Sequence, residues 1–542
     1  MPASLRLALL LGSIVSTGLA APNADALAAC KTLDDSYPDQ VATNGADIPL
    51  GLAYTQARTS YWSLANADVR PACIFFPKTA LEIQFAVQTL NKYSTAPWAI
   101  KGAGHNPNVG FSSTQDGVLI ATQQFMATTT LDSNNLAHIG PGNEWLDVAN
   151  ALQSSGRAVV SGRLGVVGVP GVTMGGGLSF LSTQYGMTSD SVVEFEVVTA
   201  EGELTRANQD QNSDLFYAMK GGGGQFAIVT EFVMQTCKHE NQLQSIYEAM
   251  EYLHCINLDP IGKVWGGHKI FTMAQKDALL NATHSLNSDY YDQKAAVIVT
   301  YSSTLDSLVD IFVVFMFYDG PEPGAILDEF NSIPSLIDQT MSNRDYNDLL
   351  DSNSFFSLKG QRYLIRTGTL PNLPGAQGID LYNFAFTSFF DGAKIAQLKE
   401  LDNYIFSMAF QPIPHQLANN SVNNPSGVNL IGLDPSYGDK VFLEYDVSWL
   451  SGLTDQRAAA AITNLTQAVQ DYGQSRYANV QPTNYRSGDL EWGYRPLFMN
   501  DAMFNQDPLK SYPAESYARL QQIQQERDPN GFFSRRTGGF KV

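Results

Sequence analysis

Two glycine-rich clusters carry the residues with the clearest chemistry. The first reads Lys101-Gly102-Ala103-Gly104-His105, and the second covers residues 168–177. Residues without bulky side chains allow consecutive backbone N–H groups to converge on a pyrophosphate, so such clusters are suited to holding a dinucleotide. The first cluster lacks the GxGxxG spacing of nicotinamide-binding folds, which disfavours a fold of that kind. An isolated Gly-x-Gly is most often a plain turn, so the flanking residues have to decide.

Longer motifs surround both clusters. Gly110-Phe111-Ser112-Ser113 follows the first cluster, and Leu178-Ser179-Phe180-Leu181 follows the second; the strand-like residues 192–202 and the glycine-containing residues 214–230 come next. In this order the motifs resemble the flavin-binding domain of the vanillyl-alcohol oxidase/p-cresol methylhydroxylase (PCMH) superfamily. The resemblance is closest to its berberine-bridge-enzyme-like branch of oxygen-dependent FAD-linked oxidoreductases.

The resemblance implies FAD as the cofactor, attached covalently through the ring of His105. The positions that match the FAD-binding motifs of the family are Lys101, Gly102, Ala103, Gly104, His105, Gly110, Val167, Gly168, Gly171, Gly175, Gly176, Gly177, Val198 and Ile228. A histidyl substituent withdraws electrons from a flavin and so favours hydride acceptance. Many members of the branch attach the flavin a second time through a cysteine. The matching residue here is Leu164, so we expect attachment through His105 only.

Val167 bears on the electron acceptor. In the family, the matching position lies near the flavin face where dioxygen reacts, and a small residue there is typical of oxidases, whereas a larger one is typical of dehydrogenases. The resemblance therefore implies an oxidase that passes its electrons to dioxygen, although valine is common in any core.

Two residues are candidates for acid–base chemistry. Glu444 lies in a strand-like stretch, residues 442–449, and resembles the base of berberine bridge enzyme. A carboxylate desolvated against flavin and aromatic rings would have its pKa raised towards neutrality, which suits a general base; a solvated strand glutamate is an equally good interpretation. The family often has a tyrosine two residues before a C-terminal Asn-Tyr. Here that position is Pro482, which cannot be a base, and Tyr485 could orient the substrate or simply pack.

The chain of 542 residues exceeds what one core usually holds, so two domains are expected. Short strands and intervening helices indicate an α+β fold, with a two-part FAD-binding domain of the PCMH type and a substrate domain whose sheet is covered by helices. Helical spacing predicts helices over residues 79–91, 144–154, 393–409 and 456–472. Strands are predicted over residues 72–77, 98–101, 118–121, 137–140, 192–199, 295–301 and 308–317.

These patterns predict six segments. They are a signal peptide (1–20), an N-terminal arm (21–66), the FAD-binding domain (67–236), an insertion (237–259), the substrate domain (260–480) and a segment that returns to the FAD domain (481–542). Arg6 precedes an apolar run over residues 7–14, with small residues near Ala20. This pattern predicts a secretory signal and a secreted protein, because the run is too short to span a bilayer.

Secretion makes disulfides plausible for the four cysteines, and sequence alone leaves three pairings open. The resemblance favours a bond between Cys30 and Cys73. Sequons at Asn281, Asn419 and Asn464 are consistent with glycosylated surface loops. No Cys-x-x-Cys pair or histidine-rich cluster offers metal ligands, so a metal site is not expected. The net charge of −20 disfavours nucleic acid and anionic membranes as partners.

Residues 237–259 interrupt the resemblance with a polar, unpatterned stretch. One interpretation is a surface insertion, closed by a bond between Cys237 and Cys255. The other is a retained intron, because the codons at both ends of the stretch can supply splice signals. Removal of that intron would join Thr236 to a tyrosine and then to Pro260.

The resulting functional prediction is a secreted FAD-linked oxidase that transfers a hydride from a small molecule, in particular a secondary metabolite, to FAD. A carbohydrate oxidase of the same family is one alternative. A secreted binding protein that keeps the fold without turnover is another, and the proline at position 482 is the best argument for it.

Overall fold

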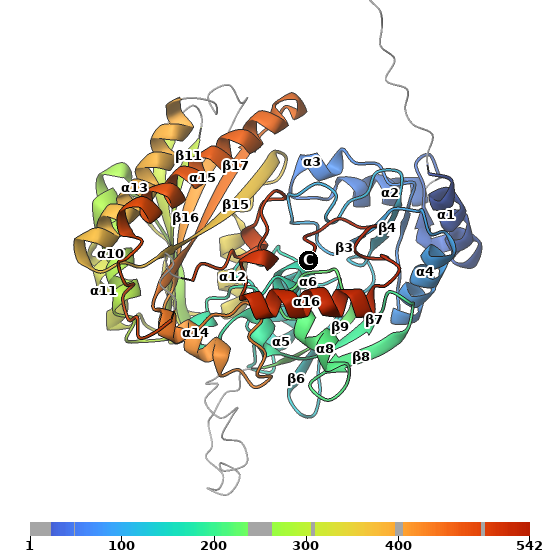
Figure 1. The fold of residues 1–542 in the computed structure, drawn as a ribbon, viewed down its shortest axis with the longest axis horizontal. Coiled ribbons are helices and arrows are strands. Elements are labelled where there is room, and N and C mark those ends of the chain that lie inside the picture. The colour runs from blue at the N-terminus through green and yellow to red at the C-terminus, as the bar shows by residue number, and fades with distance from the viewer. Residues whose placement is uncertain (1–22, 48, 237–262, 305–308, 396–404, 489–493) are drawn as a thin grey trace, which may run out of the picture.

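The computed structural model describes residues 23–47, 49–236, 263–304, 309–395, 405–488 and 494–542. Figure 1 shows two lobes, one built by the N-terminal half of the chain and one by the part that follows, with the C-terminal segment running across both. The α+β class predicted from the sequence is confirmed, with two sheets in the N-terminal lobe and one in the second lobe. Among the described residues, no helix has both the length and the apolar character needed to cross a membrane.

The N-terminal lobe begins with a sheet of four strands in the order β1-β2-β4-β3. Its strands are β1 (Val41–Ala42), β2 (Cys73–Phe75), β3 (Trp98–Lys101) and β4 (Val118–Ala121). The helices beside it are α1 (Ala24–Ser36), α2 (Leu50–Thr59), α3 (Leu64–Ala67) and α4 (Ala80–Lys92). A disulfide joins Cys30 of α1 to Cys73 of β2, as the resemblance implied. It fixes the N-terminal arm to the sheet that carries the first glycine cluster.

A second sheet of five strands completes this lobe, in the order β5-β6-β9-β7-β8. Its strands are β5 (Thr129–Leu131), β6 (Leu136–Ile139), β7 (Val192–Val198), β8 (Leu204–Asn208) and β9 (Ile228–Gln235). Its helices are α5 (Trp145–Gln153), α6 (Val169–Met174), α7 (Ser182–Tyr185), α8 (Ser213–Met219) and α16 (Ala514–Arg527). β7 and β8 form a hairpin that the sequence did not signal fully; Gly202, with φ +81°, supplies its turn.

The second lobe is an antiparallel sheet of eight strands, ordered β13-β10-β12-β11-β16-β17-β15, with β14 beside β10. The strands are β10 (Val264–Thr272), β11 (Ala295–Thr304), β12 (Val309–Tyr318), β13 (Ile337–Asp338), β14 (Met341–Arg344), β15 (Arg362–Pro371), β16 (Ile405–Ile413) and β17 (Lys440–Trp449). The helices are α10 (Lys276–Ser288), α11 (Asp328–Ser332), α12 (Tyr346–Ser354), α13 (Gly375–Ile395), α14 (His415–Val422) and α15 (Asp455–Tyr477).

Helices α10, α13 and α15 cover the outer face of this sheet, as Figure 1 shows. The apolar core beneath them includes Tyr301, Phe389 and Tyr445. Side chains alternate across a strand, so the neighbours of Tyr445 on β17, Glu444 and Asp446, face the N-terminal lobe instead. The sheet therefore presents carboxyl groups to the junction between the lobes.

The helix predicted over residues 393–409 is wrong in its last part. α13 ends at Ile395, residues 396–404 lie outside the described residues, and β16 begins at Ile405. β16 lies between β11 and β17 and is covered on its outer face, so its sequence is almost continuously apolar. A short apolar run of this kind fits a buried strand and a buried helix equally well. The predicted insertion, 237–259, also lies outside the described residues.

Candidate active site

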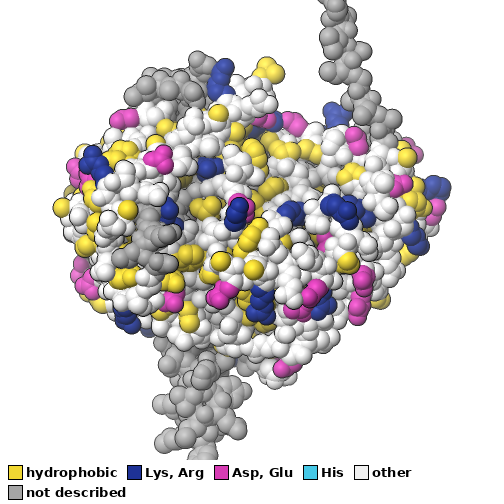
Figure 2. All heavy atoms as spheres, in the orientation of Figure 1, with side chains coloured by type: hydrophobic (Ala, Val, Ile, Leu, Met, Phe, Trp, Pro, Cys, Tyr) yellow, Lys and Arg dark blue, Asp and Glu magenta, His cyan; other side chains and the backbone are white. Residues whose placement is uncertain are grey.

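A cavity of about 360 Å³ lies at the junction between the lobes. Both glycine clusters line it on one side, and Ile365 of β15 and Glu444 of β17 line it on the other. Phe498 and Asp501 reach it from the C-terminal segment, together with residues of the tail 533–541. On the face of the molecule drawn in Figure 2, Lys and Arg side chains are interspersed with Asp and Glu and form no continuous basic surface.

The first glycine cluster follows directly from β3. Gly104 has φ +74°, and a Cβ there would lie 2.7 Å from Cε of Lys101 and 2.9 Å from the ring of Tyr61. Glycine is therefore required for both conformation and space. Lys101 itself points away from the cavity, since its ammonium donates to the carbonyl oxygens of Ala57 (2.7 Å) and Ser60 (3.0 Å). Burial, together with the charge of Lys359, lowers the pKa of Lys101 to about 7.

The second glycine cluster packs directly against the first. A Cβ on Gly168 would lie 3.0 Å from the Cβ and 3.1 Å from the backbone nitrogen of Ala103. The C-terminal segment secures the cluster through Asn500, whose amide nitrogen donates to the carbonyl oxygen of Gly171 at 2.8 Å and whose amide oxygen accepts from the backbone nitrogen of Gly177 at 3.0 Å. The absence of side chains at these contacts leaves the backbone of both clusters open to the cavity.

His105 borders the cavity with its ring stacked on Trp62. The two ring centroids are 4.6 Å apart, and Trp62 stacks in turn on Tyr363 at 3.9 Å. Nε2 of His105 lies 3.0 Å from the hydroxyl oxygen of Ser357, whereas Nδ1 makes no hydrogen bond with any described residue. Burial and the charge of Lys359 lower the pKa of His105 to about 4, so the imidazole is neutral near pH 7.

Leu164 and Val167 both line the cavity. Their loop is held by α12, because the backbone nitrogen of Gly165 donates to the hydroxyl oxygen of Ser354 at 2.9 Å. Leu164 thus brings an apolar, unreactive side chain to the position that matches a second attachment point in the family.

Glu444 lies at the centre of β17, opposite Thr367 of β15 and Ala409 of β16. Glu444 is among the residues that line the cavity. Burial and the neighbouring Asp501 raise its pKa well above the ordinary value, and the charge of Arg163 opposes this only in part. A carboxylate with a raised pKa that borders a cavity has the properties of a general base.

Three further side chains complete this group, and sequence reasoning missed all of them. Asp501 accepts a hydrogen bond from the amide of Gln411 at 3.0 Å, and both Asp501 and Arg163 line the cavity. Burial lowers the pKa of Arg163, and burial raises that of Asp501. The available signal was the stretch Phe498-Met499-Asn500, which has an aromatic residue two positions before an asparagine. The family motif has its tyrosine at the same spacing, at the position that Pro482 occupies before Asn484.

Asp446 lies one pleat further along β17, on the same face as Glu444. Burial, with a contribution from Asp501, raises its pKa to about 8, and its Oδ1 has no hydrogen-bond partner among the residues that the structure describes. The inner face of the sheet thus carries a row of carboxyl groups whose ionisation is disfavoured.

Tyr485 does not reach the cavity. Its hydroxyl donates to the carbonyl oxygen of Gly488 at 2.8 Å. The preceding Asn484 donates to the buried carboxylate of Asp439 at 2.7 Å, which also accepts from Thr483 at 2.6 Å. This stretch therefore anchors the C-terminal segment to the second lobe, and the packing role considered for Tyr485 fits its position better than a role in orienting substrate.

Five of the predicted FAD-binding residues also lie outside the lining of the cavity. They are Lys101, Gly110, Gly176, Gly177 and Val198. Gly110, Gly176 and Gly177 have positive φ angles, so they shape the loops around the cavity. Val198 is fully buried in the core between the two sheets of the N-terminal lobe. The other predicted residues, from Gly102 to Ile228, line the cavity. Among the described residues, no group of His, Cys, Asp and Glu could hold a metal ion.

Residues 71–208 match a family described as an FAD binding domain. An uncharacterized FAD-linked oxidoreductase of Arthroderma benhamiae is 35% identical over 500 residues, which cover 92% of both chains. An FAD-dependent monooxygenase of Aspergillus calidoustus is 27% identical, over 91% of this chain and 86% of its own.

Solved structures share the fold at lower identity. The 6-hydroxy-D-nicotine oxidase of Arthrobacter nicotinovorans superposes with a TM-score of 0.69 at 18% identity, covering 93% of this chain and 97% of its own. Glucooligosaccharide oxidase from Acremonium strictum, described with a 6-S-cysteinyl, 8α-N1-histidyl FAD, gives a TM-score of 0.67 at 18% identity, covering 94% and 98%. The chain therefore belongs to the FAD-linked oxidoreductases, and it is an FAD-dependent enzyme.

Proposed function

We propose that this protein is a secreted oxidase that holds FAD through His105 and oxidises a small molecule beside Glu444. When bound, FAD supplies the hydride acceptor and returns two electrons to dioxygen, which yields hydrogen peroxide. The fit of the cofactor rests on the two glycine clusters, where a Cβ at Gly168 would crowd the backbone of Ala103. Their exposed backbone suits a pyrophosphate.

Attachment through His105 alone is supported by the state of its ring. The imidazole is neutral near pH 7 because its pKa is about 4, so a lone pair is available. Nε2 interacts with Ser357, which leaves Nδ1 without a hydrogen bond among the described residues and free to form the bond. Leu164 carries no thiol, so a second attachment from that position is not expected.

Glu444 is the group we assign as the general base. The substrate gives up a hydride from carbon and a proton from an adjacent hydroxyl or amine, and the carboxylate of Glu444 takes the proton. Its raised pKa makes it a stronger base than an ordinary carboxylate, and Arg163 stabilises its ionised form. The product is the corresponding carbonyl compound or imine.

Secondary metabolites are the substrate class we favour. The support is the set of relatives with 25–28% identity, which include several FAD-dependent monooxygenases and the bifunctional solanapyrone synthase of Alternaria solani. A carbohydrate is the second candidate, because carbohydrate oxidases are among the structures that share the fold. Secretion is supported by the disulfide between Cys30 and Cys73, a bond typical of oxidising compartments.

The attachment is tested by an absorbance spectrum of purified protein before and after acid precipitation. We expect the yellow colour to stay in the pellet of the wild type and to leave it in His105→Ala. His138→Ala, which changes a histidine of β6 outside the cavity, is the matched control and should keep the colour. Colour retained by His105→Ala would point to another attachment residue. Flavin that no candidate substrate reduces, in a protein that still binds ligand, would favour a binding protein.

A further inference from the structure

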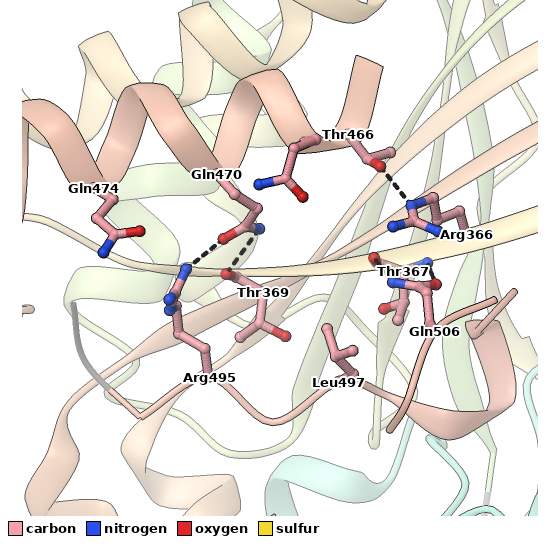
Figure 3. Close-up of a pocket in the computed structure, with 10 residues that line it drawn as sticks. Arg366, Thr367, Thr369, Thr466, Gln470, Gln474, Arg495, Leu497 and Gln506 are labelled. Atoms are coloured by element: carbon pink, nitrogen blue, oxygen red, sulfur yellow. Dashed lines mark hydrogen bonds between the residues drawn. The ribbon is translucent and has the colours of Figure 1, made fainter. Parts of the chain in front are cut away.

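A second cavity, of about 330 Å³, lies along the edge of β15, outside the active site. Figure 3 shows its two arginines bonded to side chains of α15: Arg366 donates to the hydroxyl oxygen of Thr466 at 2.6 Å, and Arg495 donates to the amide oxygen of Gln470. These hydrogen bonds join β15, α15 and the C-terminal segment, so we assign the two arginines a structural role. The flavin cavity contains a cation that is held differently.

This cation is Lys541, which belongs to the tail, residues 533–541. Among the described residues that line the flavin cavity, the basic ones besides His105 are Arg163 and Lys541, and the acidic ones are Glu444 and Asp501. Arg163 interacts electrostatically with both carboxyl groups, so its charge is already opposed there. Lys541 therefore carries the positive charge that a ligand could use elsewhere in the cavity.

The ammonium group of Lys541 has one N–H that no described residue accepts. Its other two donate to the carbonyl oxygen of Phe533 at 2.9 Å and to the hydroxyl oxygen of Thr537 at 3.2 Å, and both acceptors are neutral. The carboxylate of Asp528 acts on Lys541 only through its charge, because it accepts the backbone N–H groups of residues 532–534 instead. Burial lowers the pKa of Lys541 to about 8, so the charged form still predominates near pH 7. A partly buried ammonium with neutral partners is arranged to take an anionic acceptor.

The tail brings this ammonium group to the wall that the glycine clusters form. Gly538 packs on the loop that follows the first cluster, where a Cβ on Gly538 would lie 2.0 Å from the carbonyl oxygen of Gly110. The ring of Phe540 then packs edge-on against the ring of Phe111, with 5.0 Å between the centroids. Residues 537–541 consequently all line the cavity.

The glycine clusters themselves bring no charged side chain to this wall. Lys101 points away from the cavity and binds carbonyl oxygens of Ala57 and Ser60, and the ring of His105 is neutral near pH 7. Backbone N–H groups can bind a diphosphate, but a hydrogen bond from a charged donor is stronger. The diphosphate of FAD is negatively charged, so a cation on this wall would stabilise it.

We propose that Lys541 supplies positive charge to the diphosphate of FAD, from a tail that forms one side of the cofactor site. The proposal rests on FAD as the cofactor. It does not depend on attachment through His105 or on which substrate is oxidised.

Fluorescence titration of the full chain with FAD tests the proposal, and all chains carry His105→Ala so that the flavin can dissociate. Lys541→Gln should weaken FAD binding by roughly ten- to a hundredfold, because a charge-assisted hydrogen bond is lost. Lys541→Arg keeps the charge and should bind FAD within about threefold of the parent chain. Lys510→Gln changes an exposed lysine of the C-terminal segment outside the cavity, and it should bind like the parent.

Riboflavin is the second probe, because it has the flavin ring and no phosphate. Lys541→Gln should bind riboflavin as the parent does, whereas a variant that only disturbed the tail would lose affinity for both ligands. The proposal is overturned by an equal loss for riboflavin and FAD, by equal losses in Lys541→Arg and Lys541→Gln, or by unchanged FAD binding in Lys541→Gln. Flavin that stays attached in His105→Ala would contradict the attachment alone. The role of Lys541 would then be measured by the FAD content of the purified chains, which should fall in Lys541→Gln and not in Lys510→Gln.

Discussion

The two walls of the flavin cavity are built in different ways. On the wall formed by the N-terminal lobe, the glycine clusters leave backbone exposed, and His105 is the one predicted reactive side chain there. On the wall formed by the sheet and the C-terminal segment, the carboxyl groups of Glu444 and Asp501 line the cavity, and Arg163 of the N-terminal lobe interacts with them electrostatically. The first wall, called the backbone wall below, is suited to binding a large cofactor. The second, called the side-chain wall, is suited to accepting a proton.

Both walls nevertheless suppress charge. Burial lowers the pKa of His105 to about 4 and raises that of Asp446 to about 8, so both groups are mainly neutral near pH 6. Burial also raises the pKa of Glu444. The same enclosure thus leaves the histidine able to attack and gives the carboxylate a stronger affinity for a proton.

The largest expected effect comes from the side-chain wall. Glu444→Gln keeps the size of the side chain and removes the base, so flavin reduction should slow by about a hundredfold or more. The measurement is anaerobic stopped-flow reduction with any substrate that the wild type oxidises. Glu329→Gln, an exposed glutamate of α11, is the control and should reduce at the wild-type rate. An unchanged rate in Glu444→Gln would remove this residue from the mechanism.

The backbone wall is tested by adding a side-chain atom where its two glycine clusters meet. Gly168→Ala places a Cβ 3.1 Å from the backbone nitrogen of Ala103, which must push the two glycine clusters apart. In a His105→Ala background, where the flavin can dissociate, we expect FAD to bind about tenfold more weakly than in His105→Ala alone. Fluorescence titration with FAD measures the difference. Equal affinities would mean that the contact between the clusters does not shape the cofactor site.

The difference between the walls also explains what the sequence could predict. The backbone wall is encoded locally: consecutive glycines beside His105 are visible as a pattern, and nine of the fourteen predicted positions line the cavity. Strand β3 and helix α4 were predicted for the same reason. The spacing of their apolar residues and the residues at their ends can be read from a short stretch of the chain.

The side-chain wall is assembled from segments far apart in the chain. Arg163, Gln411, Glu444 and Asp501 come from a loop, two strands and the C-terminal segment, so no local pattern joins them. Glu444 was predicted only because side chains alternate between the two faces of a strand and because the matching position in the family is a base. Asp501 was not predicted because the family motif was matched to Asn484 and Tyr485. In the structure, Asn484 donates to Asp439 and anchors the segment to the second lobe, and Tyr485 donates to Gly488.

A separate effect, on stability and not on the flavin site, should follow from the suppressed charge on the sheet. The pKa of Asp446 is raised from 3.8 to about 8 in the folded protein, so the folded state binds more protons than the unfolded state between these values. The contribution of Asp446 to the free energy of unfolding is therefore fully present below pH 4. It falls as the pH rises towards 8, by at most about 1.4 kcal/mol per pH unit. Asp446→Asn should flatten this dependence in urea unfolding measured from pH 5 to pH 8. A slope equal to that of the wild type would contradict the assignment.

The smallest effect is expected where neither wall is involved. β9 ends at Gln235 and β10 begins at Val264, and the residues that line the cavity lie before or after this interval. If residues 237–259 come from a retained intron, a chain that reads Thr236, tyrosine, Pro260 is the natural product. That variant should keep the wild-type flavin content and reduction rate. Transcript sequencing supplies the independent measurement: a mature message that keeps the segment as its main form would rule out the intron. Loss of flavin in the shortened chain would show instead that the segment is needed for the flavin site.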